Sequence, residues 1–316
     1  MPVNTISRFR LSNNNAAKGQ TAILFAAVLW GTTGTVASFA SQLSALAIGA
    51  FAMGIGGVLL ATMARKKLLS DAGKLTFLKK ELIIGALAVA TYPLAFYSSM
   101  QFAGVAIGTV VSIGSAPFAT ALLERLFSKN STLDKRWFLS VVIGLIGIIL
   151  LTYSEDAGSL QDGSNSVKII GVLLGMLAGV TYAVYSWVAR SMIEKGIQSE
   201  SAMGSLIALS ALILLPSLLF TGEHLFSNMT NIMVVCYMAV IPMFIGYLAF
   251  GFGLRYVHAS KATLLTLFEP VVAALLAVLI VGESISLVGW FGIVLVITCL
   301  FLQSQNKTKM IKVNRS

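Results

Sequence analysis

One carboxylate stands inside a long apolar stretch, where a charge is costly. Glu269 comes nine residues after the start of the apolar run 260–281, so it would lie roughly 13 Å along a helix. A charged side chain at the centre of a bilayer costs about 2.5–3.5 kcal/mol on insertion scales, so it is expected to be protonated, paired or exposed to a wet cavity. Glu269 could therefore exchange protons or bind an amine, or it could be a structural carboxylate bonded to a neighbouring helix.

Aromatic and hydroxyl residues in the apolar runs could form the walls of such a cavity. Aromatic faces supply contact area and attract cations without a counter-charge, which suits zwitterionic or amphipathic molecules. Trp30 and Tyr182 are the preferred pair, because their separation of 152 residues is close to that of an internal repeat. The candidate wall residues are Trp30, Thr33, Tyr92, Phe96, Ser112, Ser115, Tyr182, Tyr185 and Tyr247. Ordinary helix packing is the alternative role for the same side chains.

Two prolines inside the apolar runs and three charged residues near the ends of the runs are expected to have structural roles. Pro117 and Pro270 each remove a backbone hydrogen bond inside an apolar run. The freed carbonyls can bind polar groups or let a helix bend, so we predict hinges at both positions. Lys261, Glu124 and Arg125 lie near the ends of apolar runs, where their charges are expected to reach the membrane interface.

Other kinds of chemistry lack the residues that they need. The sequence has no G-x-x-x-x-G-K-[ST] phosphate-binding loop. His224 and His258 lie near connections without metal-ligand partners, and Cys236 and Cys299 lie in apolar runs. No serine has plausible histidine and aspartate partners for nucleophilic catalysis. We therefore expect no cofactor, no metal and no enzymatic activity.

The elements that must position these residues are membrane helices. Of the 316 residues, 57% are hydrophobic and 11% are charged, whereas a soluble domain carries roughly 25% charged residues. The mean hydropathy of +0.88 excludes a water-soluble surface. A helix that crosses the bilayer core needs roughly 20 apolar residues. Ten runs of this kind cover residues 19–38, 44–64, 81–99, 104–123, 138–154, 169–189, 201–220, 231–252, 260–281 and 286–303.

The distribution of lysine and arginine predicts the orientation. If the N-terminus is cytoplasmic and each run crosses once, 21 of the 22 basic residues fall inside and only Lys168 falls outside. This split supports both the helix count and two cytoplasmic termini. It also explains the net charge of +10 without a nucleic-acid partner. The first run is longer than the core of a usual signal peptide, so we expect an uncleaved first helix.

An internal repeat relates the two halves of the chain. At an offset of 153 residues, Pro117 falls on Pro270, and eight of 22 positions are identical. Trp137 and Phe138 fall on Trp290 and Phe291. Because each half has an odd number of helices, five, the second half is inverted relative to the first. Inverted repeats around a central site are a common build for secondary transporters.

Several motifs resemble those of EamA-type proteins of the drug/metabolite transporter superfamily. The segment 259–270, with Glu269-Pro270 at its end, is followed by Gly282-Glu283 and Gly289-Trp290. Trp30-Gly31 and Ser115-Ala116-Pro117 fit the first half. The resemblance implies a ten-helix exporter of amino acids, other metabolites or drugs. Its central cavity would be lined by helices 1, 3, 4, 6, 8 and 9. Asn130 departs from the pattern, since the family usually has an acidic residue there, as at Glu283.

The sequence thus predicts an all-α integral membrane protein with two inverted five-helix repeats around a central cavity. The repeats would span residues 1–155 and 168–304, and a basic cytoplasmic tail would cover 305–316. We expect a secondary-active or facilitative exporter in the cytoplasmic (inner) membrane of a bacterium. Its partners would be a small-molecule substrate, the lipid bilayer and, for a coupled carrier, protons. An importer of the same fold, a channel and a membrane-embedded lipid-handling protein remain alternatives.

Overall fold

The computed structural model describes residues 13–128, 134–155, 165–282 and 284–304, and these form an all-helical bundle. Asn130, Glu283 and the predicted tail 305–316 lie outside the described residues. The first-half helices are α1 (Asn13–Gly31), α2 (Thr33–Ser38), α3 (Ala45–Met63), α4 (Arg65–Phe77), α5 (Lys79–Ala103), α6 (Val105–Phe127) and α7 (Lys135–Glu155). The second-half helices are α8 (Asn165–Glu194), α9 (Ser199–Thr221), α10 (Met229–Met238), the π-helical segment η1 (Ala239–Gly246), α11 (Tyr247–Leu254), α12 (Ala259–Leu265), α13 (Phe268–Leu276), the π-helical segment η2 (Ala277–Val281) and α14 (Leu287–Ser304).

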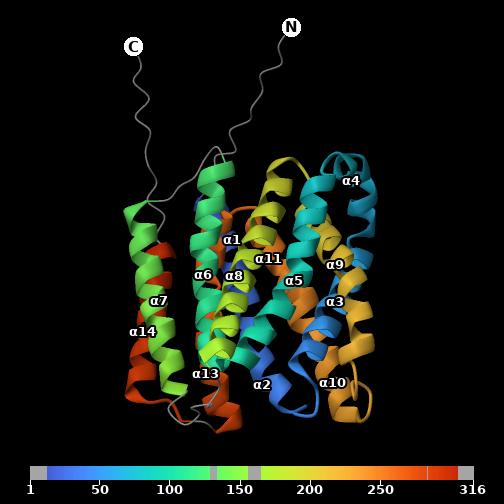
Figure 1. Cartoon of the computed structure of the whole chain (residues 1–316). Helices are drawn as coiled ribbons and strands as arrows, with labels where there is room; N and C mark the ends of the chain where they lie inside the picture. The colour runs from blue at the N-terminus through green and yellow to red at the C-terminus, as the bar shows by residue number, and fades with distance from the viewer. Residues whose placement is uncertain (1–12, 129–133, 156–164, 283, 305–316) are drawn as a thin grey trace, which may run out of the picture.

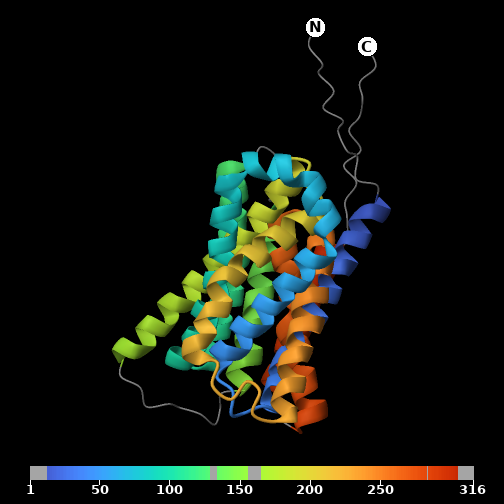
Figure 2. The ribbon, with the colours of Figure 1, turned by 90° about the vertical axis from the view of Figure 1, so that its right-hand side faces the viewer.

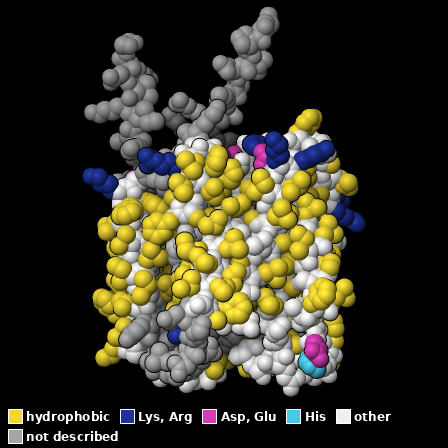
Figure 3. Space-filling view, viewed as in Figure 1, with side chains coloured by type: hydrophobic (Ala, Val, Ile, Leu, Met, Phe, Trp, Pro, Cys, Tyr) yellow, Lys and Arg dark blue, Asp and Glu magenta, His cyan; other side chains and the backbone are white. Residues whose placement is uncertain are grey.

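Each of the ten predicted apolar runs coincides with one helix or with a series of consecutive helices. Within the described residues, eight segments are long and apolar enough to cross a membrane, and α14 adds a shorter apolar helix over Leu287–Leu302. Apolar side chains cover most of the face of the bundle that Figure 3 shows, as a lipid-facing surface requires. The chain therefore has the build of a multi-pass membrane protein.

One helix was not predicted from hydropathy. The charged stretch between the second and third apolar runs was treated as a polar connection, but it forms α4. Its 13 residues reach only about 20 Å, so α4 is too short to cross the bilayer core. Asp71 ties α4 to the bundle, because its buried carboxylate accepts a hydrogen bond from the Gln198 backbone N–H at 2.9 Å.

The ends of the bundle differ in charge. α1 begins and α14 ends at the end of the bundle that also carries α4 (Figure 1). Lysine and arginine side chains line the rim of this end (Figure 3). Ion pairs connect several of them to neighbouring helices, including Lys195 with Glu81 and Lys67 with Glu200, both at 2.6 Å. We call this the basic end of the bundle.

Packing between the halves places the long helices around a common centre. α5 and α6 pack on α8, α3 packs on α9, and α7 packs on α14 at one edge (Figure 1). In the perpendicular view α8 runs diagonally across the bundle (Figure 2). α7 and α14 cross closely at Gly147 and Gly292, where a Cβ on Gly147 would lie 2.8 Å from the Gly292 carbonyl oxygen.

The two aligned prolines have different local structures. Pro117 lies within the continuous helix α6, whereas Pro270 follows the break between α12 and α13. Because proline has no N–H, the Thr266 carbonyl cannot accept a bond from Pro270, and it accepts one from the Glu269 N–H at 3.0 Å instead. This tighter turn lies at the junction of α12 and α13, next to Glu269.

Candidate functional site

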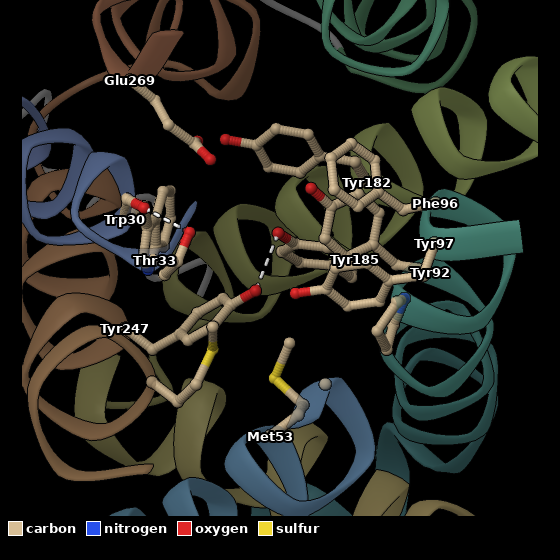
Figure 4. Close-up of a pocket in the computed structure, with 13 residues that line it drawn as sticks. Trp30, Thr33, Met53, Tyr92, Phe96, Tyr97, Tyr182, Tyr185, Tyr247 and Glu269 are labelled. Atoms are coloured by element: carbon tan, nitrogen blue, oxygen red, sulfur yellow. Dashed lines mark hydrogen bonds between the residues drawn. The ribbon is translucent and has the colours of Figure 1, made fainter. Parts of the chain in front are cut away.

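A small cavity lies between the two halves, about halfway along the helices. Glu269 is ten residues from the start of α12 at Ala259, or roughly 15 Å along a helix. The cavity has a volume of about 60 Å³, which is room for a few water molecules or one small polar group. It is lined by Trp30, Thr33, Gly49, Met53, Tyr92, Pro93, Phe96, Tyr97, Tyr182, Tyr185, Met243, Tyr247 and Glu269 (Figure 4).

Tyrosine and phenylalanine rings from α5 and α8 form one wall. The ring of Tyr92 lies 5.8 Å from Phe96, 5.5 Å from Tyr182 and 6.0 Å from Tyr185, centroid to centroid. Tyr182 and Tyr185 stack on each other at 5.2 Å. These separations lie in the range in which aromatic pairs attract each other. The wall is therefore a packed aromatic cluster whose faces and edges border the cavity.

Trp30 forms the opposite wall and is held in place by the π-helical segment η1. Its indole N–H donates to the Pro242 carbonyl at 3.0 Å, and its ring lies 5.0 Å from that of Tyr247. Gly246 allows this approach, because a Cβ there would lie 2.8 Å from the indole nitrogen. The neighbouring Thr33 hydroxyl donates to the Trp30 carbonyl at 2.7 Å. Trp30 thus presents its ring, while its polar N–H is already satisfied.

Two hydroxyl contacts join α8 to the broken helices of the second half. The Thr266 hydroxyl donates to the Thr263 carbonyl, so the Tyr182 hydroxyl is the donor in its 2.7 Å bond with Thr266. The hydroxyls of Tyr185 and Tyr247 lie 3.3 Å apart. The bond of Tyr182 connects the aromatic cluster to the break between α12 and α13, shortly before Glu269, and the contact of Tyr185 connects it to α11.

Among the described residues, Glu269 is the single carboxylate that lines the cavity. Its side chain is half-buried and points from α13 toward the aromatic cluster (Figure 4). Among the described residues, none donates a hydrogen bond or forms an ion pair with this carboxylate. A carboxylate in such a low-dielectric site becomes neutral by taking up a proton, or, when it is ionised, is stabilised by a cation, a hydrogen-bond donor or water. The cavity is therefore suited to accept a positively charged group.

The structure brings most of the predicted site residues together. Trp30, Thr33, Tyr92, Phe96, Tyr182, Tyr185, Tyr247 and Glu269 all line this one cavity. Ser112 and Ser115 lie elsewhere, since they pack against Gly179 of α8, where a Cβ would meet the Ser112 carbonyl oxygen at 2.6 Å. Ser112 is fully buried, and its hydroxyl has no hydrogen-bond partner. A binding role for these residues stays a prediction.

Some cavity residues were not on the predicted list. Tyr97 lies beside Phe96, with ring centroids 5.3 Å apart, and Gly49 makes room for it at the surface of α3. Met53 and Met243 complete the lining. Aromatic content indicates Tyr97, since three aromatic residues occur within six positions at 92–97. The methionines carry no such signal, because flexible apolar side chains are equally common in packing.

A second carboxylate has a different environment, and the expected exposure of its side chain was wrong. Glu124 of α6 was expected to reach the membrane interface, but it is buried, with 2% of its surface exposed. Its two oxygens accept bonds from the backbone N–H and the hydroxyl of Ser260, at 3.0 and 2.5 Å. Ser260 is the second residue of α12, so Glu124 caps the positive end of that helix. Trp137 adds a bond from its indole N–H to the Ser260 carbonyl at 3.5 Å.

The surroundings of this cap contain further charged groups. His258 precedes α12, and burial together with nearby Arg190 lowers the pKa of its imidazole below the ordinary value. Within the described residues, no three His, Cys, Asp or Glu side chains come together as metal ligands would.

The fold and the cavity define a multi-pass membrane protein built around an internal polar site. The model of the EamA-like transporter family matches residues 17–153 and again 169–305. The chain therefore belongs to the EamA-like transporter family and is a membrane transporter. The two matched segments are the two halves that surround the cavity.

Similar proteins carry the same class of name. The "Uncharacterized transporter YwfM" of Bacillus subtilis is 33% identical over 89% of this chain and 92% of its own length. The "Uncharacterized inner membrane transporter YicL" of Salmonella typhimurium is 25% identical over 91% of this chain and 95% of its own length. A "Probable amino-acid metabolite efflux pump" of Salmonella typhimurium is 27% identical over 62% of this chain and 66% of its own length. A solved crystal structure shares the fold, with a TM-score of 0.75 and 16% sequence identity. The match covers 90% of this chain and 95% of the other chain.

Proposed function

We propose that this chain is a secondary carrier that exports small metabolites, amino acids among them, across the cytoplasmic membrane. The observation that carries the proposal is the cavity between the two halves, in which Glu269 is the single carboxylate among the lining residues that the structure describes. In inverted-repeat transporters, substrate and ion sites lie near the bilayer midplane at the repeat interface, typically where helices are broken. The break between α12 and α13 lies beside Glu269 and matches this arrangement.

The proposed topology has ten crossings, with both termini cytoplasmic. The basic end of the bundle is the end where α1 begins and α14 ends (Figure 3). Lysine and arginine favour the cytoplasmic face of a membrane protein. α7 and α14 pack on each other beside the eight candidate spans, so they would supply the ninth and tenth crossings.

Export is proposed over import because of a relative. One similar protein is named an efflux pump for amino-acid metabolites, and no residue of the cavity specifies a direction. The cycle would use a proton gradient or the solute's own gradient, and Glu269 is the candidate group for either a proton or a cargo amine. Pro270, beside the break, is the candidate hinge, and Pro117 is its counterpart in α6. We propose no enzymatic activity.

The test compares small molecules that are released by cells with wild type, with an equal amount of Glu269→Gln, or with an empty vector. The proposal predicts that a few solutes accumulate outside only with the wild type. Equal release by the two proteins, above the empty vector, would keep export and make Glu269 structural. Uptake of the same solutes, in place of release, would contradict the direction of transport.

A further inference from the structure

The charge balance of the cavity narrows the class of cargo. The described residues that line it include one carboxylate, Glu269, and no lysine, arginine or histidine. No described residue donates a hydrogen bond to that carboxylate or pairs with it. A buried anion without a partner is unfavourable, and a cation that enters the cavity removes this cost.

The walls also favour a cation. The faces and edges of Trp30, Tyr92, Tyr182, Tyr185 and Tyr247 border the cavity beside Glu269 (Figure 4). An ammonium group near aromatic faces is attracted by the ring quadrupoles, most strongly by that of tryptophan. Aromatic cages of this kind recognise alkylammonium groups in other proteins. The rings and the carboxylate therefore select for the same charge.

A cargo carboxylate would find few partners in the same place. The indole N–H of Trp30 is engaged by the Pro242 carbonyl, and the Tyr182 hydroxyl by Thr266. The donors that remain for an anion are neutral phenol hydroxyls such as those of Tyr92 and Tyr97. A negative group would also lie near Glu269, and like charges at close range repel strongly in a low dielectric.

We propose that the cavity recognises the ammonium group of its cargo and prefers amines of net positive charge to zwitterionic amino acids. This inference rests on the proposed function, because it concerns the same cavity. The cavity volume of about 60 Å³ accommodates an ammonium head group in this conformation. The remainder of the cargo needs the aromatic side chains to move.

The experiment uses three ligands of one carbon skeleton that differ in charge. These are isoamylamine, a cation; leucine, the corresponding zwitterion; and 4-methylpentanoate, the corresponding anion. Binding to the purified full chain is measured by calorimetry in lipid nanodiscs. We expect isoamylamine to bind at least about tenfold more tightly than leucine, and 4-methylpentanoate to bind least, since each tenfold step corresponds to about 1.4 kcal/mol.

A matched pair of variants assigns the preference to the cavity. Glu269→Gln removes the carboxylate charge, so it should weaken isoamylamine binding at least about tenfold. Glu194→Gln makes the same chemical change outside the cavity lining, at a side chain that is 47% exposed and pairs with Arg190. It should leave the affinity unchanged.

Three results would overturn the inference. Leucine or 4-methylpentanoate could bind as tightly as isoamylamine, or Glu269→Gln could keep the full affinity for isoamylamine. The third result is that neither isoamylamine nor the smaller cation tetramethylammonium binds the wild type. The three ligands are compared on the wild type, so the preference for cations can be tested even if Glu269→Gln does not fold. The binding experiment does not measure transport. The preference for cations can therefore hold when the export proposal fails, and the export proposal can hold when the preference for cations fails.

Discussion

Two carboxylates within the apolar helices, Glu124 and Glu269, have opposite environments. Glu124 is buried, and Ser260 donates a hydrogen bond to each of its two oxygens. Glu269 faces the cavity, and no described residue donates to its carboxylate. A satisfied carboxylate stabilises the fold, whereas an unsatisfied one is a cost to the fold that a proton or ligand can remove. The comparison assigns a structural role to Glu124 and leaves Glu269 available for function.

The contact at Glu124 also connects the two halves of the chain. It joins α6 of the first half to α12 of the second half, toward the basic end of the bundle. The hydroxyls of Thr120 and Thr263 lie 3.3 Å apart on the same two helices, one turn nearer the cavity. The two halves are therefore joined by buried polar groups between the cavity and the basic end.

The largest expected effect on stability comes from Glu124→Leu. This change leaves the N–H and the hydroxyl of Ser260 buried without an acceptor, and it should lower the free energy of unfolding by about 3 kcal/mol. Thermal unfolding in detergent measures the change. Glu223→Leu is the control, because the Glu223 side chain is 87% exposed and such a side chain is expected to contribute within about 0.5 kcal/mol. Equal stability of Glu124→Leu and the wild type would contradict the structural role.

For Glu269→Gln we expect the opposite pattern. Transport should fall at least about tenfold, or 1.4 kcal/mol, because the charge that binds a cation or proton is lost. Stability should stay the same or rise, since an unpaired buried charge is removed. Both quantities are measured on one preparation. A destabilised Glu269→Gln with normal transport would reverse the assignment of the two carboxylates.

A smaller effect is expected at Ser260. Ser260→Ala removes the hydroxyl that donates to Glu124 but keeps the backbone N–H bond. The loss should be about 1.5 kcal/mol, the lower end of the range for a hydrogen bond to a carboxylate, because the backbone N–H bond remains. Combining it with Glu124→Leu tests the assignment, since two residues in contact should show non-additive effects. Strict additivity would mean that the Ser260 hydroxyl acts independently of Glu124.

The smallest expected difference lies within the aromatic cluster. Tyr182→Phe removes the bond to Thr266 and should cost about 0.6 kcal/mol, the average for such bonds between membrane helices. Tyr92→Phe removes a hydroxyl for which the described residues provide no hydrogen-bond partner, so it should be neutral within about 0.5 kcal/mol. Thermal unfolding of the two variants, measured side by side, shows which hydroxyl contributes to stability. A larger loss for Tyr92→Phe would mean that its hydroxyl has a partner.

The helices and most of the cavity could be predicted because they follow from periodicity and composition. Long apolar runs predict α3, α5 and α9, and an aromatic residue within such a run is a natural candidate for a cavity wall. α4 was missed because its stability comes from contacts with α9, including the bond between Asp71 and Gln198. Hydropathy along the sequence contains no information about such contacts.

The internal repeat predicted that aligned residues of the two halves have equivalent surroundings, but in the structure their surroundings differ. Pro117 and Pro270 align, but only Pro270 adjoins a helix break. Trp137 and Trp290 also align, yet Trp137 is buried against Ser260 while Trp290 is 44% exposed. Glu124 was assigned to the interface because of its place near the end of an apolar run. The neighbour that satisfies it, Ser260, is 136 residues away, so local sequence could not reveal the contact.

The most direct test of the central claim is to block the cavity chemically. Thr33 lines it, so Thr33→Cys is prepared with Cys236→Ser, which removes the exposed native thiol, while Cys299 is buried. A charged methanethiosulfonate reagent then labels the cysteine at position 33. The control is Glu223→Cys in the same background, because Glu223 is exposed. Our account predicts that labelling Thr33→Cys lowers export of the solutes found with wild type at least about tenfold, or 1.4 kcal/mol, and that labelling Glu223→Cys does not. Normal export by fully labelled Thr33→Cys would show that cargo does not pass through this cavity.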